Sequence, residues 1–308
     1  MARCLVIGGN GFLGSHLVDA LAAAGHEVTV FDRFGSPVQY TAEAGQTRGD
    51  FLDLPALAAA LEGQEHVFHF LSATTPATAE DDPTTDLRLN LAGSVDLFTL
   101  AAKAGVARLT FASTGGAIYG DQPVEAISED LVPLPVSPYA IGKLAIEGYL
   151  RYFRAKHGLE SVSFRISNPY GPRQHAHRKQ GVIPIFLQRI AEGRPITVFG
   201  DGSMVRDYVY VEDVAAMIAA TVTRSPEHPV YNVGSGVGTS VADLLSLARE
   251  VTGREVEVVH EPQPVTFVNR SVLDVSRFVG EFGVRPAVSL RAGMEITWQD
   301  TLRQAADG

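Results

Sequence analysis

The stretch RCLVIGGNGFLGSHLVDALAAAGHEVTVFD, residues 3–32, decides the fold. Residues 3–9 are an apolar run typical of a buried strand. Residues 14–26 have the spacing of a helix, which ends at Gly25, and residues 27–32 are typical of a second strand. A strand, a glycine-rich turn, a helix and a strand in this order predict a βαβ unit with parallel strands.

The same alternation continues through the first two thirds of the chain and then stops near residue 170. It predicts a doubly wound parallel α/β sheet with helices on both faces, formed by a domain at 1–168. Residues 169–308 mix short strands and short helices, which predicts a smaller α/β part, with a helix near 213–223 that packs back on the first domain. The remaining helices of the first domain are expected at 54–63, 84–105 and 138–157, and the remaining strands at 66–72, 107–113 and 160–166.

The overall composition excludes several classes of protein. A chain of 308 residues with a net charge of −10 is a poor general binder of nucleic acid, because phosphate contacts need clustered Lys and Arg. It has no run of 18 apolar residues, which predicts no membrane contact. The single cysteine, Cys4, cannot form an internal disulfide, and the first residues lack the layout of a signal peptide. We therefore expect a cytoplasmic enzyme.

The turn GGNGFLG, residues 8–14, has the spacing of a dinucleotide-binding loop. It satisfies both Gly9-x-Gly11-x-x-Gly14 and Gly8-x-x-Gly11-x-x-Gly14. Glycines allow a tight turn and a close approach of backbone to a pyrophosphate, and the following helix N-terminus attracts its negative charge. The turn therefore predicts a Rossmann-type domain that binds NAD, with cofactor contacts at Gly8, Gly11, Phe12, Leu13 and Gly14.

Asp32 ends the second strand, where a carboxylate can accept hydrogen bonds from both ribose hydroxyls of NAD. The same charge would repel the 2′-phosphate of NADP. The neighbouring Arg33 could instead accommodate such a phosphate. Asp32 therefore favours NAD, whereas Arg33 is compatible with NADP. We expect both to contact the cofactor and expect the cofactor to be NAD.

Tyr139 and Lys143 stand four residues apart at the start of the helix expected at 138–157. This spacing places both side chains on one face of the helix. A phenol titrates near pH ~10, so it is almost fully protonated at neutral pH and cannot accept a proton as a base. A nearby ammonium group and an oxidised nicotinamide would lower the pKa of Tyr139, and Lys143 can also hold the nicotinamide ribose. The pair therefore predicts a catalytic acid/base and its partner.

Five segments occur together in one order and with suitable spacing over nearly the whole chain. They are the glycine turn, FASTGGAIYG at 111–120, SPYAIGK at 137–143, RISNPYGPRQ at 165–174 and DGSMVRDYVYVEDV at 201–214. In this combination the chain resembles the extended short-chain dehydrogenases/reductases of the NAD-dependent epimerase/dehydratase family, nearest to its nucleotide-sugar 4-epimerases of the UDP-glucose type.

The resemblance implies roles for further residues. Asp50, with Phe51 beside it, matches the acid that contacts the adenine amine, and Asn168 matches a residue that touches the nucleotide-sugar phosphates. Arg206 matches the diphosphate-binding arginine. Val182, Ile183 and Phe199 would lie near the base, although their apolar side chains are equally typical of a core. The helices at 84–105 and 138–157 resemble those that pair in a dimer interface, so we expect a homodimer.

The loop STGGAIYG, residues 113–120, departs from the pattern of the family's dehydratases. Those enzymes carry an Asp-Glu pair where this chain has Gly116 and Ala117, and neither residue can move a proton. Many 4-epimerases have Ser or Thr at the position of Gly115. Here the hydroxyls are one and two residues earlier, so we expect Thr114 to be catalytic and keep Ser113 as the second candidate. Both hydroxyls could also merely hydrogen-bond within the turn.

Two other segments limit what the resemblance implies about the substrate. At 262–274 the chain has Pro264 and Phe267 where many epimerases have an Arg-x-Gly-Asp pattern, and Arg270 could replace that arginine at the diphosphate. It could equally be a surface residue. The segment HAHRKQ at 175–180 carries two histidines but no cysteine or carboxylate, so we expect no metal there and a solvated loop over the substrate.

The expected function is the NAD-dependent 4-epimerisation of a nucleotide-diphosphate sugar, most simply a UDP-hexose, through a transient 4-keto intermediate. A first alternative is an NAD(P)H-dependent reductase of a nucleotide-linked 4-keto-6-deoxy sugar, which would use the same residues. A second is a non-catalytic protein that senses NAD. The presence of both Tyr139 and Lys143 disfavours this last alternative.

Overall fold

The computed structural model describes residues 1–174 and 181–307, so the predicted solvated loop at 175–180 lies outside the described residues. The chain forms two compact units. The first consists of residues 1–114, 137–165 and 215–231, and the second of residues 115–136, 166–214 and 232–308. The segment 115–136 therefore groups with the C-terminal part, although it lies inside the predicted domain 1–168. That domain boundary stays a prediction.

The first unit alternates strands and helices as the sequence predicts. The long helix expected at 84–105 is present but is interrupted by a π-helical turn, and it ends at Gly105, whose φ of 70° is left-handed. The elements are β1 (Arg3–Ile7), α1 (Phe12–Ala23), β2 (Glu27–Asp32), β3 (Gly45–Arg48), α2 (Leu54–Leu61), β4 (His66–His69), α3 (Pro76–Asp81), α4 (Pro83–Asp86), η1 (Leu87–Ala92), α5 (Gly93–Ala104), β5 (Arg108–Thr114), α6 (Pro138–His157), β6 (Ser161–Ile166), α8 (Val211–Ala220) and β10 (Val230–Val233).

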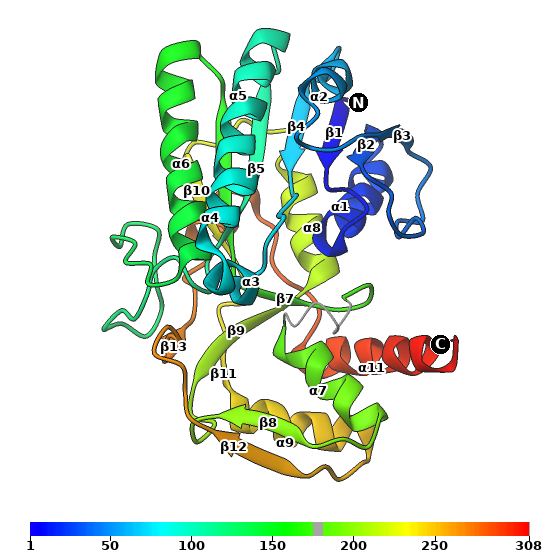
Figure 1. Ribbon diagram of the computed structural model, residues 1–308, viewed down its shortest axis with the longest axis vertical. Coiled ribbons are helices and arrows are strands. Elements are labelled where there is room, and N and C mark those ends of the chain that lie inside the picture. Colours follow the sequence, from blue (N-terminus) through cyan, green and yellow to red (C-terminus); the bar gives the residue numbers. More distant parts are fainter. Residues whose placement is uncertain (175–180, 308) are drawn as a thin grey trace. The chain divides into compact units, whose positions relative to one another are not determined.

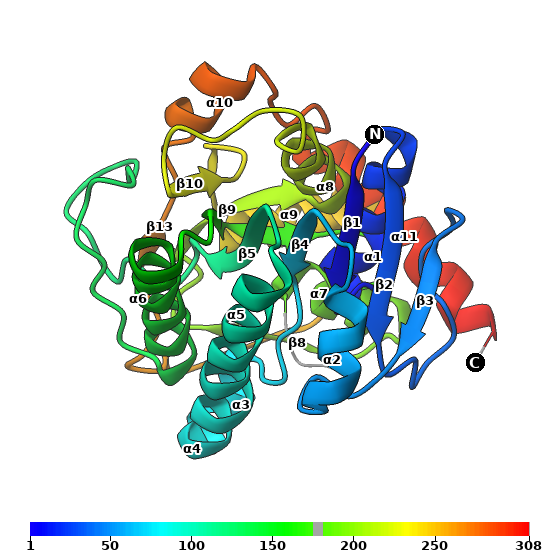
Figure 2. The ribbon, with the colours of Figure 1, turned by 90° about the horizontal axis from the view of Figure 1, so that it is seen from above.

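The central sheet has seven strands in the order β10-β6-β5-β4-β1-β2-β3, and β5, β4, β1, β2 and β3 run parallel. Figure 2 shows these five strands in a row. The chain fills one side of β1 with β2 and β3 and then returns to the other side with β4. The strand order thus reverses at β1, and in such sheets ligands bind beyond the carboxyl ends of the strands at this point. The glycine turn lies there, directly after β1.

One face of this sheet is covered by α2, α5 and α6, and Figures 1 and 2 show α5 and α6 side by side. Leu5 and Ile7 of β1 pack in this core with Leu57, Phe98 and Ile146, all of them at most 1% exposed. Fully burying one such side chain contributes roughly 1.5–3 kcal/mol, so this apolar layer supplies much of the stability of the unit.

A buried ion pair ties α6 to the sheet. The guanidinium group of Arg165 on β6 donates to both carboxylate oxygens of Glu147, at 3.1 and 2.7 Å, and the two side chains are 6% and 7% exposed. The same carboxylate accepts a 2.6 Å hydrogen bond from the hydroxyl of Ser113 at the end of β5. The carboxylate of Glu147 thus links α6 to β5 and β6, and these hydrogen bonds fix the position of the helix relative to the two strands.

The second unit contains short strands and four helices among its described residues. In it β9 pairs with β7, β11 and β13, β12 pairs with β8, and apolar side chains of α7, α9 and α11 form a separate core. Its elements are β7 (Asn168–Tyr170), α7 (Val182–Ala191), β8 (Ile196–Phe199), β9 (Val205–Tyr210), β11 (Gly238–Ser240), α9 (Val241–Thr252), β12 (Val258–Glu261), β13 (Arg270–Ser271), α10 (Ser276–Phe282) and α11 (Leu290–Asp307).

None of the helices in residues 1–174 and 181–307 is both long and apolar enough to cross a membrane. The predictions of a cytoplasmic location and of a homodimer stay predictions.

We expect Arg165→Ala to lower the free energy of unfolding by about 3–5 kcal/mol, because it leaves the buried carboxylate of Glu147 without its cation. The measurement is urea denaturation followed by circular dichroism. The matched control is Arg154→Ala, which removes an equally short pair with Glu160 at 2.8 Å whose side chains are 42% and 56% exposed, and which should cost at most about 1 kcal/mol. Equal losses in the two variants would contradict this assignment.

Candidate active site

The glycine turn after β1 forms a cradle that has no room for side chains. Gly8 has a φ of +80°, and a Cβ there would lie 2.8 Å from the backbone of Leu71. A Cβ on Gly14 would collide with the carbonyl group of Gly8. The helix α1 begins after Gly11 without any side-chain cap, so its first backbone N–H groups are left for a ligand. These features fit a pyrophosphate group approaching the helix N-terminus, as the sequence predicts for Gly8, Gly11, Phe12, Leu13 and Gly14.

Asp32 lies at the end of β2, directly beside this turn. Its carboxylate accepts hydrogen bonds from the backbone N–H groups of Asn10, at 3.1 Å, and Phe34, at 3.2 Å. These bonds fix the orientation of the carboxylate and leave lone pairs on both oxygens. This arrangement fits the predicted hydrogen bonds to the ribose hydroxyls.

Arg33 and Asp50, two further predicted cofactor residues, face each other across 3.9 Å. Both side chains are more than half exposed, so water screens their attraction and either one can turn to a ligand. The ring of Phe51, in contrast, is only 5% exposed and stacks on His69 at a centroid distance of 5.3 Å. Because the ring is part of the core, it offers no face to a cofactor, and the predicted contact of Phe51 could be made only by its backbone.

The helix α6 presents Tyr139 and Lys143 one turn apart, as predicted. Ser137 caps its N-terminus by accepting a hydrogen bond from the N–H of Ala140, and Pro138 occupies the first helical position. The ammonium group of Lys143 donates to the carbonyl oxygen of Ala112 at 2.9 Å. It also lies 5.6 Å from the centre of the Tyr139 ring, so the geometry brings the predicted acid/base and its partner together.

Burial dominates the electrostatics of this pair. It lowers the pKa of Lys143 to about 8, because the ammonium group loses its hydration, while the carboxylates of Asp86 and Glu147 oppose the change. Burial, followed by the charge of Asp86, raises the pKa of Tyr139 to about 12. The lowered pKa that the sequence predicts for Tyr139 is therefore not a property of the protein alone. Desolvation of the phenol dominates, so a lowered pKa of Tyr139 would have to come from the charge of bound NAD.

The two candidate hydroxyls at the end of β5 have different surroundings. Ser113 is 5% exposed and its hydroxyl is engaged by the carboxylate of Glu147. Thr114 is half-buried, and within residues 1–174 and 181–307 its hydroxyl makes no hydrogen bond. This difference favours Thr114 over Ser113 as the hydroxyl that is available to a substrate.

In the second unit, Gly116 of the loop 113–120 lies next to Asn168. The amide of Asn168 donates to the backbone carbonyl of Asp207 at 3.0 Å, and a Cβ added to Gly116 would lie 3.3 Å from the amide oxygen. Ser271 donates to the carbonyl oxygen of Gly115 at 3.2 Å. Asn168, which is predicted to contact the phosphates, thus lies next to the glycines of the loop within this unit.

The two predicted anion-binding arginines do not share a face of their sheet. Arg270 pairs with Val205, and Ser271 pairs with Arg206, so the alternation of strand side chains directs Arg206 and Arg270 to opposite faces. The guanidinium group of Arg270 is 3.6 Å from the Cβ position of Gly238, on the face of Val205, and donates to the carbonyl oxygen of Glu125. The prediction that Arg270 joins Arg206 at one diphosphate is therefore not supported by this geometry.

The apolar residues predicted near the base belong to the core of the second unit. Ile183 is 1% exposed within this core, and Val182 and Phe199 pack against it. Phe199 also contacts Phe267 edge-on at a centroid distance of 5.5 Å. Core packing thus accounts for all three side chains, and their nearness to a substrate stays a prediction.

Three carboxylates buried in their units are not predicted from the sequence: Glu147, Asp86 and Asp207. Glu147 follows Lys143 by four residues and so lies on the same helix face, which is a signal in the sequence. Asp86 lies on α4 and has no such signal beyond its spacing to Asn90. Asp207 is fully buried and accepts hydrogen bonds from the backbone N–H groups of Ser235, Gly236 and Leu273.

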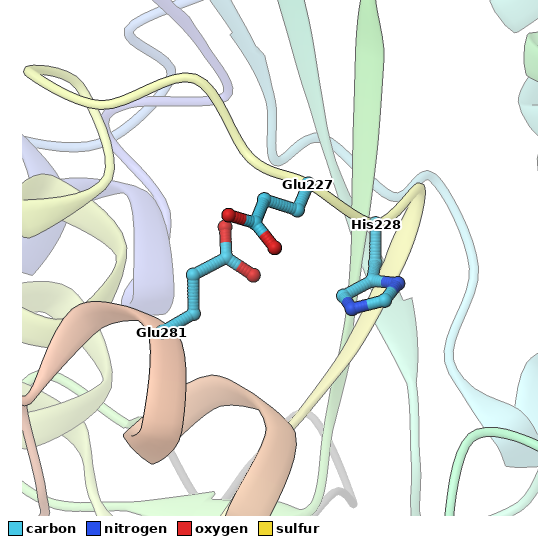
Figure 3. A group of neighbouring side chains, drawn as sticks. All are labelled: Glu227, His228 and Glu281. Atoms are coloured by element: carbon cyan, nitrogen blue, oxygen red, sulfur yellow. The ribbon is translucent and has the colours of Figure 1, made fainter.

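The histidines considered for a metal site are His175 and His177, which lie outside the described residues. Figure 3 shows another histidine beside a carboxylate, His228 next to Glu227 on the segment that leads into β10, and also labels Glu281 of α10. The ring of His228 packs edge-on against Tyr231 at 5.8 Å, and its backbone N–H donates to the phenol oxygen at 2.9 Å. These contacts give His228 a packing role in the first unit, and the prediction of no metal stays a prediction.

We expect Gly14→Ala to weaken NAD binding at least about tenfold, ~1.4 kcal/mol, because the added methyl group collides with the carbonyl of Gly8. Isothermal titration calorimetry measures the affinity, and circular dichroism checks that the variant is folded. The matched control is Gly280→Ala on α10, where a Cβ meets open space and binding should not change. A folded Gly14→Ala protein with unchanged affinity would place the cofactor elsewhere.

Comparison with known proteins places this geometry in a family. Residues 4–234 match the model of the NAD dependent epimerase/dehydratase family. The UDP-glucose 4-epimerase of Mycolicibacterium smegmatis is 35% identical over 304 residues, which cover 96% of this chain and 97% of that protein. Relatives named as a dehydratase and as a reductase of nucleotide sugars also match.

Two solved structures have closely similar folds. The UDP-glucose 4-epimerase of Thermotoga maritima, solved with UDP-glucose, has a TM-score of 0.92 and 36% identity, and the match covers 99% of each chain. The enzyme of that name from Thermus thermophilus, solved with NAD, has a TM-score of 0.91 and 36% identity, covering 97% of this chain and 99% of the other. These findings confirm the predicted Rossmann-type sheet and NAD as the cofactor. The chain therefore belongs to the NAD dependent epimerase/dehydratase family, as an NAD-dependent enzyme.

Proposed function

We propose that the enzyme interconverts two nucleotide-diphosphate hexoses that differ at C4, with UDP-glucose and UDP-galactose as the first candidates. One observation carries the proposal. The chain combines the Tyr139–Lys143 pair with a loop, residues 113–120, that holds hydroxyls and glycines but no carboxylate. Together with NAD, such a site can oxidise one C–OH group and reduce it again. It lacks the additional acid and base that are needed to expel water from the sugar.

The residues of the first unit would share the chemistry as follows. Tyr139 takes the proton of the 4-hydroxyl group and later gives it back to the 4-keto oxygen. The ammonium group of Lys143, 5.6 Å from the ring centre, supports the phenolate by its charge. The hydroxyl of Thr114 hydrogen-bonds the reacting oxygen. NAD, when bound at the glycine turn, would supply the chemistry of accepting a hydride from C4 and returning it to the opposite face of the 4-keto sugar.

Residues of the second unit would bind the rest of the substrate. The guanidinium group of Arg206 is braced by the carbonyl oxygens of Val205, at 2.9 Å, and Val268, at 2.5 Å. Carbonyl groups do not neutralise its charge, so it is suited to hold a diphosphate. Asn168, beside Gly116, would contact the same group. UDP is favoured as the nucleotide because the relatives named above include UDP-glucose 4-epimerases.

The reductase alternative uses the same residues and differs in its cofactor. A reductase consumes NAD(P)H in every turnover, whereas an epimerase regenerates NAD. The carboxylate of Asp32 next to the glycine turn favours the recycled NAD, because its charge disfavours a 2′-phosphate. Asp32 therefore favours the epimerase over the reductase.

The first test is proton NMR of the purified protein with UDP-glucose, UDP-glucuronate and UDP-N-acetylglucosamine, without added reductant. We expect one of them to equilibrate with its 4-epimer while NAD stays catalytic. Tyr139→Phe should lower kcat by about 10²–10⁴-fold, because the general acid/base is lost, with NAD affinity unchanged. Turnover of a 4-keto sugar that requires stoichiometric NAD(P)H, with no epimerisation, would identify a reductase instead.

A second test separates the two hydroxyls. Thr114→Val, which keeps the shape of the side chain, should lower kcat about tenfold by removing one hydrogen bond worth ~1.4 kcal/mol in the transition state. Ser113→Ala should instead lower the free energy of unfolding by about 1–3 kcal/mol, because the buried carboxylate of Glu147 loses a donor. A larger kcat loss in Ser113→Ala than in Thr114→Val would reverse the two roles.

A further inference from the structure

Asp86, the last residue of α4, is a buried carboxylate that the proposed mechanism leaves without a role. It is 2% exposed. Its Oδ1 atom accepts a hydrogen bond from the side-chain amide of Asn90 at 2.7 Å and another from the hydroxyl of Thr74. Both donors are uncharged. A carboxylate is costly to bury without a positive charge nearby, so the position of its charge needs an explanation.

The other oxygen of Asp86 rests against α6. A Cβ added to Gly142 would lie only 2.6 Å from Oδ2, so the carboxylate touches the helix backbone at the residue directly before Lys143. The helix α4 packs on α6 at this point (Figure 1). Glycine is an unfavourable residue inside a helix, and here its lack of a side chain is what admits the carboxylate.

Of the other ionisable groups around Lys143, only Glu147 also supports its ammonium form, and its effect is smaller than that of Asp86. Glu147, one turn further along α6, is already paired with the guanidinium group of Arg165. His69 on β4 is neutral, because burial lowers its pKa to about 3. Tyr139 on α6 is also neutral, since burial raises its pKa to about 12. Among the described residues, the ammonium group also contacts the carbonyl oxygen of Ala112 and the ring of Phe111.

We propose that Asp86 is a positioning residue that holds Lys143 in its ammonium form from across the α4–α6 contact, with Gly142 as the opening that lets it do so. The inference rests on the proposed role of Lys143, since a neutral amine could not support the phenolate of Tyr139. Asp86 itself touches neither substrate nor cofactor in this scheme. It acts through Lys143, whose pKa it raises against the effect of burial.

The decisive experiment observes Lys143 without any substrate. The chain has four lysines, at positions 103, 143, 156 and 179, so NMR of protein labelled with ¹³C at lysine Cε gives few signals, and Lys143→Arg assigns the one of interest. We expect a titration midpoint near the pKa of about 8 in the unchanged protein. In Asp86→Asn the midpoint should fall by about one pH unit, because an opposite charge nearby is removed.

The matched control is Asp81→Asn, which makes the same chemical change at an exposed position at the end of α3 and should leave the midpoint unchanged. An Asp86→Asn midpoint that stays the same or rises would overturn the proposal.

A second pair of variants keeps the test decisive if Asp86→Asn does not fold. Gly142→Ala places a methyl group against Oδ2 of Asp86 and should push the carboxylate away, which lowers both the Lys143 midpoint and the melting temperature. Gly148→Ala, in the same helix, places its Cβ no closer than 4.0 Å to another group, the side chain of Arg151, so it should raise the melting temperature and leave the midpoint unchanged. If Gly142→Ala leaves the midpoint unchanged, Asp86 does not act on Lys143.

The pH dependence of kcat provides a third measurement once a substrate is known. The alkaline limb of the profile should move to lower pH in Asp86→Asn, because Lys143 then loses its proton earlier. Failure of every UDP-sugar to react would reject UDP-hexoses as the substrates and leave the NMR result on Asp86 intact. A shifted NMR midpoint with an unshifted alkaline limb would show that Lys143 is not the group that controls turnover.

Discussion

The arrangement of the first unit depends on the single carboxylate of Glu147. It accepts hydrogen bonds from Arg165 on β6 and from Ser113 on β5, so it fixes the rotation of α6 about its own axis and its height above the sheet. Tyr139 and Lys143 lie two turns and one turn before it on the same face of the helix. Their position beside the end of β5 is therefore a consequence of this buried network.

The network also decides which hydroxyl is left for chemistry. A hydroxyl that already donates a 2.6 Å hydrogen bond to a buried carboxylate cannot donate to a substrate without leaving that carboxylate unsatisfied. Ser113 is thus used for structure, and the next residue, Thr114, is spared. A shift of one position along the strand therefore separates the hydroxyl that serves the structure from the hydroxyl proposed for the reaction, and the glycines at 115 and 116 follow directly after it.

The parts of this site that the sequence predicts are those whose cause is local. The glycine turn needs its residues because of its own backbone, Asp32 follows from the end of a strand, and a four-residue spacing puts Tyr139 and Lys143 on one face. Glu147 and Asp86 were missed because their partners, Arg165 and Thr74, come from other elements of the chain. The same reason explains Phe51: its stacking on His69 depends on how β4 packs, which no short segment reveals.

The prediction for Arg270 stays a prediction, but it depends on the register of a strand. Sequence reasoning offers Arg270 as a replacement for the arginine of the family's Arg-x-Gly-Asp pattern, and a pairing shift of one residue reverses the face on which a side chain emerges. Pairing with Val205 sends Arg270 away from the face of Arg206. Because the segment 262–274 lacks the usual pattern of the family, comparison with that pattern does not determine which of its residues pairs with Val205.

In the second unit, the freedom of Arg206 to bind an anion follows from how its neighbour Asp207 is satisfied. Asp207 is fully buried, and burial raises its pKa while the hydrogen bonds from the N–H groups of Ser235, Gly236 and Leu273 oppose this change. Because backbone donors stabilise that carboxylate, it does not need a cation. Strand alternation puts Arg206 on the other face, where its guanidinium group donates to uncharged carbonyl oxygens. Among the residues that the structure describes, Arg206 is not hydrogen-bonded to a carboxylate, although the charge of Asp121 acts on it, and a local positive charge of this kind favours a diphosphate on a protein of net charge −10.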